Sequence, residues 1–375
     1  MTREPRPVKI KFDNELREAF KQYKRARSLS YEADTRTLQH NNSVEVLLTR
    51  LAPVQALALD QYTLADRNGN TVSVGSSSYA FSFAFFDSPD YETFFNLRVK
   101  RRLVETAIFN RSSSLILWMP ITATYTSKGR KTPADLKERA LSAIRASLFK
   151  IAVEQHDCLS LWRQRKPRLK HLYPRQTKED NSIPRATYDD NVVSYYKVAK
   201  ASPFPSQSFL AYYHVLEYYF LRISELVLHD RLTAMLNNPG FHANRESLDK
   251  VISVVRGQDS RSDETEMLRN VLDRFVQESD LIHFIQEFEE QVGEKVYSKR
   301  RSVFGESLQV SPQKDHAIAN AAKLLKHVRN AIVHSSDRYK REDCHIPLSD
   351  SEALIEEFIP LVRFFAERVI FGTAT

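Results

Sequence analysis

The chain has 375 residues, of which 42% are hydrophobic and 27% charged, and its net charge is +8. This composition is typical of a globular protein that can bury two modest cores, and it excludes collagen-like and disordered chains. Eight glycines and no GxGxxG or GxxxxGK[ST] pattern argue against nucleotide-binding folds built on glycine-rich loops. The only cysteines, Cys158 and Cys344, are distant in sequence, which excludes a Cys-rich zinc site and indicates a reducing compartment.

The sequence gives no sign of a membrane segment. No run of about 18 uncharged apolar residues occurs, and residues 1–11 lack an apolar core of signal-peptide length. We therefore expect a soluble, cytoplasmic protein with no membrane partner.

The first half is predicted to be α+β. Residues 13–28 predict a charged helix with Leu16, Phe20 and Tyr23 on one face, and about 30–130 favour a mixed or β-rich domain. The β-forming segments are 43–51, 54–74 (two strands around Asn68-Gly69-Asn70), 79–86 (YAFSFAFF, where aromatic and small residues alternate) and 113–126. Pro133 opens a predicted helix over 134–155 with an apolar stripe: Leu136, Ala140, Ile144, Leu148 and Ile151.

Charge is unevenly distributed along the chain. Through Pro205 the net charge is +13, and after it −5, which indicates a polyanionic partner for the first half. The basic residues are densest over 162–178, where they are interleaved with Trp162 and Tyr173. Cations beside aromatic rings are typical of single-stranded RNA contacts, although a solvated basic linker has the same composition. The predicted RNA-binding residues are Arg163, Arg165, Lys166, Arg168 and Lys170.

The second half predicts a helical bundle. Residues 208–232 are apolar on nearly every side, as in a buried central helix, and 262–278 and 279–292 predict two more helices. Ser311-Pro312 is a typical helix start, followed by the stripe Ile318, Ala321, Leu325, Val328 and Ile332. Residues 351–370 form the last predicted helix. The expected organisation is a mixed domain over 1–160, a Pro-containing basic connection over 161–207 and a helical domain over 208–375.

The segment LLKHVRNAIVHSSDR (324–338) carries the strongest functional signal. It resembles the RxxxxH signature of HEPN domains, here Arg329 to His334, with an Asn beside the Arg. The upstream FLAYYHVLEYYF looks like the aromatic first helix of Apea-like HEPN domains from prokaryotic defence proteins. The resemblance covers about 206–371. It implies an all-α HEPN bundle and metal-independent RNA cleavage without a cofactor, in a homodimer that brings two motifs together.

The chemistry of these side chains suits that reaction. Histidine transfers protons near neutral pH, which makes His334 the predicted acid or base. Arg329 presents a permanently charged fork to the phosphate, and Asn330 orients His334 or a phosphate. Arg329 and His334 lie about 140° apart around an ideal helix. They meet at one phosphate only if the helix loosens or if two subunits contribute complementary groups.

Glu217 is an acid in a mostly apolar helix, where an unpaired charge is costly. We predict that it supports the site by pairing with Arg329; another arginine or a position at the helix rim are the alternatives. Arg and His near a helix end also serve as caps. A metal nuclease centre among the acids of the first half is a weaker alternative: Asp60, Asp66, Asp87, Asp90 and Glu92.

Three functions are compatible with these observations. The first is an endoribonuclease acting in phage defence, abortive infection or as a toxin. The second is a non-catalytic HEPN-like protein for nucleic-acid binding or assembly. In the third, which extends the first, the first half recognises a trigger and releases the nuclease. A phage-derived trigger or an antitoxin is a further expected partner.

Overall fold

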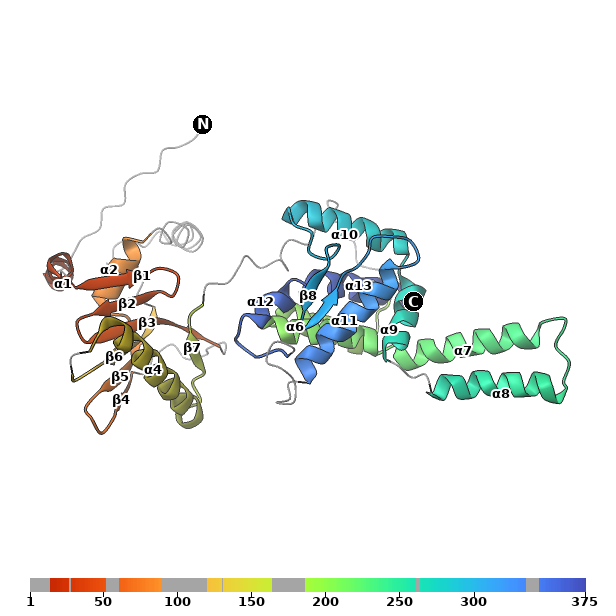
Figure 1. Cartoon of the computed structure of the whole chain (residues 1–375), viewed down its shortest axis with the longest axis horizontal. Helices are drawn as coiled ribbons and strands as arrows, with labels where there is room; N and C mark the ends of the chain where they lie inside the picture. The colour runs from red at the N-terminus through yellow and green to blue at the C-terminus, as the bar shows by residue number, and fades with distance from the viewer. Residues whose placement is uncertain are drawn as a thin grey trace, which may run out of the picture. The chain divides into compact units, whose positions relative to one another are not determined.

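The structure, a computed structural model, describes residues 14–26, 28–51, 61–88, 120–129, 131–163, 186–260, 264–334 and 344–375. The chain divides into two compact units, Met1–Gln164 and Arg165–Thr375. An antiparallel sheet with helices forms the first unit, and helices dominate the second (Figure 1). The predicted α+β class is confirmed.

The first unit is built on an antiparallel sheet in the order β1-β2-β3-β6-β5-β4, with β7 paired to β3. The long central strand β3 registers Val44 with Tyr125 and Val46 with Ala123 of β6. The strands are β1 (Leu29–Glu32), β2 (Thr37–His40), β3 (Ser43–Arg50), β4 (Tyr62–Ala65), β5 (Thr71–Ser76), β6 (Ile121–Thr126) and β7 (Leu159–Leu161). The sequence indicated β3 to β6, but not β1, β2 or β7. Residues 52–60 and 113–119 of the predicted β-segments lie outside the described residues.

The predicted turn between β4 and β5 is confirmed. Asp66 Oδ1 accepts hydrogen bonds from the backbone N–H groups of Asn68 and Asn70 at 2.8 and 2.9 Å. Gly69 adopts φ +78°, a conformation that glycine reaches at little cost. The local Asp-Arg-Asn-Gly-Asn sequence therefore sets the hairpin by its own hydrogen bonds.

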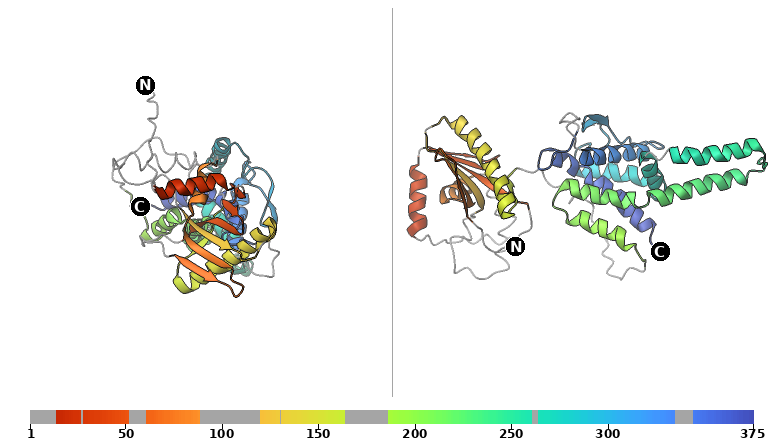
Figure 2. Two further views of the ribbon diagram at one scale, coloured as in Figure 1. Left: turned by 90° about the vertical axis from the view of Figure 1, so that its left-hand side faces the viewer. Right: turned by 90° about the horizontal axis from the view of Figure 1, so that it is seen from below.

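Helix α4 (Pro133–Gln155) covers one face of the sheet. Its predicted apolar stripe is buried in full and packs against Val44, Val46, Val72 and Val74. The Thr132 side chain caps the helix by accepting from the Asp135 N–H, and Pro133 occupies the first turn. Helix α1 (Asn14–Arg25) lies on the opposite side of the sheet, as the right-hand view of Figure 2 shows.

The prediction of a strand over 79–86 was wrong, because these residues form helix α2 (Tyr79–Phe86). Ser78 starts the helix by accepting a hydrogen bond from the Phe81 N–H. All side chains from Phe81 to Phe85 are buried, with Phe81 and Ala84 in one cluster and Phe83 packed with Leu16 of α1. A short helix covered on several sides leaves no polar face, so its sequence shows no helical period.

The second unit is a bundle around one large core. Its elements are α5 (Asp190–Ala201), α6 (Pro205–Glu217), α7 (Phe220–Leu236), α8 (Arg245–Ser260), α9 (Glu264–Phe275), α10 (Glu278–Val292), the hairpin β8 (Arg301–Val303) and β9 (Glu306–Leu308), α11 (Ala317–Val333), α12 (Ser351–Glu356) and α13 (Ile359–Gly372). Helix α5 falls within the predicted connection, yet it buries Val192 and Ala199 in this core. That part of the predicted connection is wrong.

The predicted helix over 208–232 is in fact two helices. Helix α6 ends at Glu217, and Phe220 starts α7, which runs outward beside α8 (Figure 1). Leu221 is 73% exposed and Leu226 41%, so only the first part of the segment is a central buried helix. The final predicted helix is likewise divided into α12 and α13, with Pro360 in the first turn of α13.

Helix α11 does not begin at Ser311-Pro312 but at Ala317. The carboxylate of Glu278, at the start of α10, accepts hydrogen bonds from the backbone N–H groups of Asp315 and Ile318. An acid from a neighbouring helix therefore satisfies N–H groups at the helix start, a role that the sequence alone assigned to Ser311.

Candidate functional site

Helix α11 positions the RxxxxH segment through its buried stripe. Ile318, Ala321, Leu325 and Val328 are at most 6% exposed and fix the rotation of the helix. The last turn then presents Arg329 and Asn330 as partly buried residues. The helix ends at Val333, and His334 leaves the helical conformation with φ −102° and ψ 63°.

Arg329 lies where three helices meet. Its Nη2 donates to Oε1 of Glu217 on α6 at 3.2 Å, and its Nε lies 3.4 Å from Oε1 of Glu264 on α9. Its Nη1 donates to the side-chain oxygen of Asn330 at 3.2 Å. The Arg329 side chain is 22% exposed, so two carboxylates hold the guanidinium at the surface of the bundle rather than within its core.

The predicted pairing of Glu217 with Arg329 is present in the structure. The other oxygen of the same carboxylate, Oε2, lies 2.8 Å from Nδ1 of His214, one helical turn earlier on α6. The hydrogen bond with His214, and then the charge of Arg329, hold the pKa of Glu217 below its ordinary value despite partial burial. Glu217 is therefore ionised at neutral pH.

Glu264 has a similar second contact. The Tyr213 hydroxyl donates to its Oε1 at 3.0 Å. Burial, followed by the charge of Glu264, raises the pKa of Tyr213 far above its ordinary value, so this phenol stays protonated. A buried tyrosine thus fixes the acid that faces Arg329 Nε.

The sequence interpretation missed three members of this network: Tyr213, His214 and Glu264. His214 was detectable, because His and Glu three apart on one helix face form a pair by spacing alone. Glu264 carries no comparable signal, since it is one of several acids at the start of α9. Its contact with Arg329 depends on tertiary packing.

His334 is separated from this network. Its imidazole is exposed, and among the described residues it makes no hydrogen bond or ion pair with Arg329 or Asn330. Only its backbone N–H bonds to Asn330, through the carbonyl oxygen at 2.8 Å. The expected side-chain contact between Asn330 and His334 is not formed, because the Asn330 amide oxygen accepts from Arg329 instead. Residues 335–343, which follow the motif, lie outside the described residues.

His327, two positions before Arg329, has a different role. Its Nε2 lies 2.8 Å from the carbonyl oxygen of Val303, and its Nδ1 lies 3.1 Å from Glu306 Oε2. Both partners belong to the β8–β9 hairpin. This histidine therefore attaches the hairpin to α11 and does not face Arg329.

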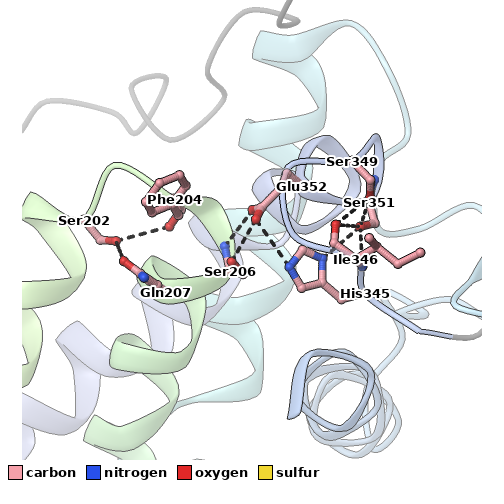
Figure 3. Close-up of polar contacts among 9 residues, drawn as sticks. All are labelled: Ser202, Phe204, Ser206, Gln207, His345, Ile346, Ser349, Ser351 and Glu352. Atoms are coloured by element: carbon pink, nitrogen blue, oxygen red, sulfur yellow. Dashed lines mark hydrogen bonds and ion pairs between the residues drawn. The ribbon is translucent and has the colours of Figure 1, made fainter. Parts of the chain in front are cut away.

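A second polar cluster surrounds the buried side chain of His345 (Figure 3). Its Nδ1 lies 2.8 Å from the Ser351 hydroxyl, and its Nε2 lies 3.3 Å from Glu352 Oε1, without hydrogen-bond alignment. Glu352 accepts from the N–H and the hydroxyl of Ser206 at the start of α6. The His345 N–H bonds to Ala331 O of α11 at 2.9 Å, so the cluster ties α6, α11 and α12 together.

This cluster has the residue types of a Ser-His-acid triad but not its geometry. The Ser351 hydroxyl also contacts the N–H and carbonyl oxygen of Ile346 and the hydroxyl of Ser349. A hydroxyl engaged on every side is a structural cap rather than an available nucleophile.

Of the predicted RNA-binding residues, only Arg163 is described, and it is exposed. Arg165, Lys166, Arg168 and Lys170 lie outside the described residues. Trp162 is partly buried, and the guanidinium carbon of Arg36 lies 3.9 Å from the centre of its ring. One face of this ring therefore stacks on a cation of its own unit.

Within the described parts of the chain, no group of three or more His, Cys, Asp or Glu side chains is placed to hold a metal ion. No described helix is both long and apolar enough to cross a membrane. Comparison of this chain with protein-family models, with curated proteins and with solved structures found no match.

Proposed function

We propose that this protein is a metal-independent endoribonuclease of the HEPN type, with Arg329, Asn330 and His334 at its active centre. The observation that carries the proposal is the placement of Arg329. A motif arginine stands at the surface, oriented by Glu217 and Glu264 and next to a histidine-bearing helix end. Such fixed orientation is what a phosphate clamp requires, because pre-positioned charge needs no reorganisation during reaction.

Arg329 retains capacity for a phosphate. A guanidinium carries five N–H donors. Hydrogen bonds to described residues use two of them, and Nε faces Glu264 in an ion pair at 3.4 Å. Glu217 and Glu264 also repel a phosphate, so substrate binding must offset that repulsion. We expect the basic residues of the first unit and of the 162–178 stretch to supply this attraction, since phosphate contacts dominate RNA affinity.

The proposed partners follow from the same assignment. RNA is the substrate, and a homodimer brings two motifs to one cleft. We also propose a role as an antiphage effector or toxin, in which the first unit receives a trigger or an antitoxin. These roles rest on the HEPN resemblance and on the distribution of charge.

The direct test is RNA cleavage by the purified full-length chain in EDTA. Matched controls are available within the molecule. Arg269→Ala removes an exposed arginine paired with Asp273, and His283→Ala removes an exposed histidine paired with Glu287. We expect Arg329→Ala and His334→Ala to abolish cleavage and both controls to retain it. Cleavage that survives either motif substitution contradicts the site assignment.

A non-catalytic assembly or nucleic-acid-binding protein is the second candidate. It is favoured by the pairing of Arg329 with two carboxylates, which resembles a structural ion-pair network. If this candidate is right, RNA stays intact under every condition, and the effect of Arg329→Ala is confined to a lower free energy of unfolding.

A further inference from the structure

His214 and Arg329 are joined by one carboxylate. Glu217 Oε1 accepts from Arg329 Nη2 at 3.2 Å, and its Oε2 lies 2.8 Å from His214 Nδ1. The His214 side chain is 48% exposed, whereas Glu217 is 26% exposed. The partly buried Glu217 therefore fixes one ring nitrogen of His214, and the rest of the ring reaches solvent.

This geometry is the one that directs a histidine toward proton transfer. When a carboxylate holds Nδ1–H, the tautomer is set and Nε2 becomes the exchanging atom. The same carboxylate stabilises the imidazolium that exists during the reaction. The Tyr195 ring of α5, 5.5 Å away between centroids, limits the motion of the His214 ring.

Metal-free RNA cleavage requires two proton transfers, and the RxxxxH motif of one subunit supplies a single histidine. The 2′-oxygen loses a proton as it forms a bond to phosphorus. The bond from phosphorus to the 5′-oxygen breaks, and that oxygen gains a proton. The products are a 2′,3′-cyclic phosphate and a 5′-hydroxyl, and no redox partner or other reactant is needed. One acid and one base account for both protons.

We propose that His214 is the second proton-transfer residue of the ribonuclease site, acting through Nε2 on the oxygen that His334 does not serve. This inference rests on the proposed ribonuclease function. Arg329 is the phosphate clamp of this site and is connected to His214 through the Glu217 carboxylate. Glu217 is a positioning residue in this arrangement.

Two variants separate proton transfer from positioning. His214→Gln keeps an N–H donor for Glu217 but carries no transferable proton, and His214→Ala leaves space for a small base. We expect both to lower the single-turnover cleavage rate by about 10²-fold or more, the usual contribution of acid–base catalysis. Added imidazole should restore cleavage by His214→Ala but not by Arg329→Ala. His283→Ala, which breaks an exposed His–Glu pair on α10, is the control and should cleave like wild type.

The outcomes are distinct. Slow cleavage by His214→Gln together with imidazole rescue of His214→Ala supports the proposal. Wild-type rates in His214→Gln show that the residue only orients Glu217 and overturn it, as does the absence of imidazole rescue in a folded His214→Ala protein. In both cases loss of cleavage in His334→Ala leaves the ribonuclease function standing. If wild-type protein does not cleave RNA, the function and this inference fail together.

Discussion

Arg329 and His214, on different helices, contact opposite oxygens of the Glu217 carboxylate. This arrangement connects a residue of the RxxxxH segment to one on the aromatic helix α6. Glu217 is therefore the carboxylate that these two side chains share.

Replacement of Glu217 by Gln removes that charge with little change in shape. Arg329 then loses one of its two carboxylates, and His214 loses the acceptor at Nδ1. We expect the free energy of unfolding to fall by about 1.5–3 kcal/mol, the range for hydrogen bonds to charged groups, as measured by urea unfolding at pH 7. Glu246→Gln breaks an exposed pair with Lys250 and should leave the midpoint unchanged. Equal midpoints for the two variants contradict a structural role for Glu217.

Arg329→Lys keeps the positive charge but removes the planar fork. An ammonium cannot reproduce donors directed at Glu217, Glu264 and Asn330 together. We expect RNA cleavage by this variant to be nearly as low as that of Arg329→Ala. Near-wild-type cleavage would show that charge alone suffices, against the clamp geometry.

The exposed imidazole of His334, which makes no hydrogen bond or ion pair with Arg329 or Asn330 among the described residues, leads to a prediction about the dimer. If each site takes Arg329 from one subunit and His334 from its partner, inactive Arg329→Ala and His334→Ala proteins complement one another. Random exchange of subunits between equal amounts should restore about a quarter of wild-type cleavage, because half the dimers then hold one intact site. Mixtures that remain inactive after exchange contradict shared sites.

Glu352 makes stability depend on pH. Burial by itself raises the pKa of Glu352, but contacts with His345 and Ser206 outweigh burial and hold it below the ordinary value of 4.5. Its contribution is therefore complete above the unfolded-state pKa and is lost as pH falls through the lower folded-state pKa. Glu352→Gln should destabilise the protein at pH 7, and its difference from wild type in urea titrations should shrink as pH falls below 4.5. A difference that is constant with pH would contradict the assignment.

Substitution of Thr122 tests the role of Glu45, the buried acid of the first unit. Burial raises the pKa of Glu45, opposed by hydrogen bonds from Ser78 and Thr122. Thr122→Val removes one donor, at 2.8 Å, without changing side-chain shape. We expect a loss of about 0.5–1.5 kcal/mol, the net contribution of one hydrogen bond, because Glu45 Oε1 still accepts from the Ser78 N–H. Because the Thr122 hydrogen bond favours ionised Glu45 and opposes the rise of its pKa, the loss should grow as pH rises through the folded-state pKa of Glu45, which lies above 4.5. The exposed Thr126→Val is the control, and a matching change there would refute the explanation.

The sequence predicted those elements in which local pattern and tertiary environment agree. The apolar stripes of α4 and α11 each face one core, so the helical spacing of their apolar residues is visible in the sequence. Helix α2 is buried on several sides, so its sequence shows no helical period of apolar residues. The boundary between α6 and α7 could not be seen in the sequence, because Tyr218 and Tyr219 are as apolar as their neighbours. The Glu217–Arg329 pair followed from the cost of an isolated charge. The contribution of Glu264 depends on the packing of α9, which local sequence does not encode.

The most direct test of the central claim is the initial rate of RNA cleavage in EDTA by wild-type and Arg329→Ala protein at equal concentration. We expect cleavage by wild type, products ending in a 2′,3′-cyclic phosphate, and a rate for Arg329→Ala lower by about 10²-fold or more, the loss typical of a charge-stabilising donor. Equal rates for the two folded proteins, or intact RNA with both, would contradict it.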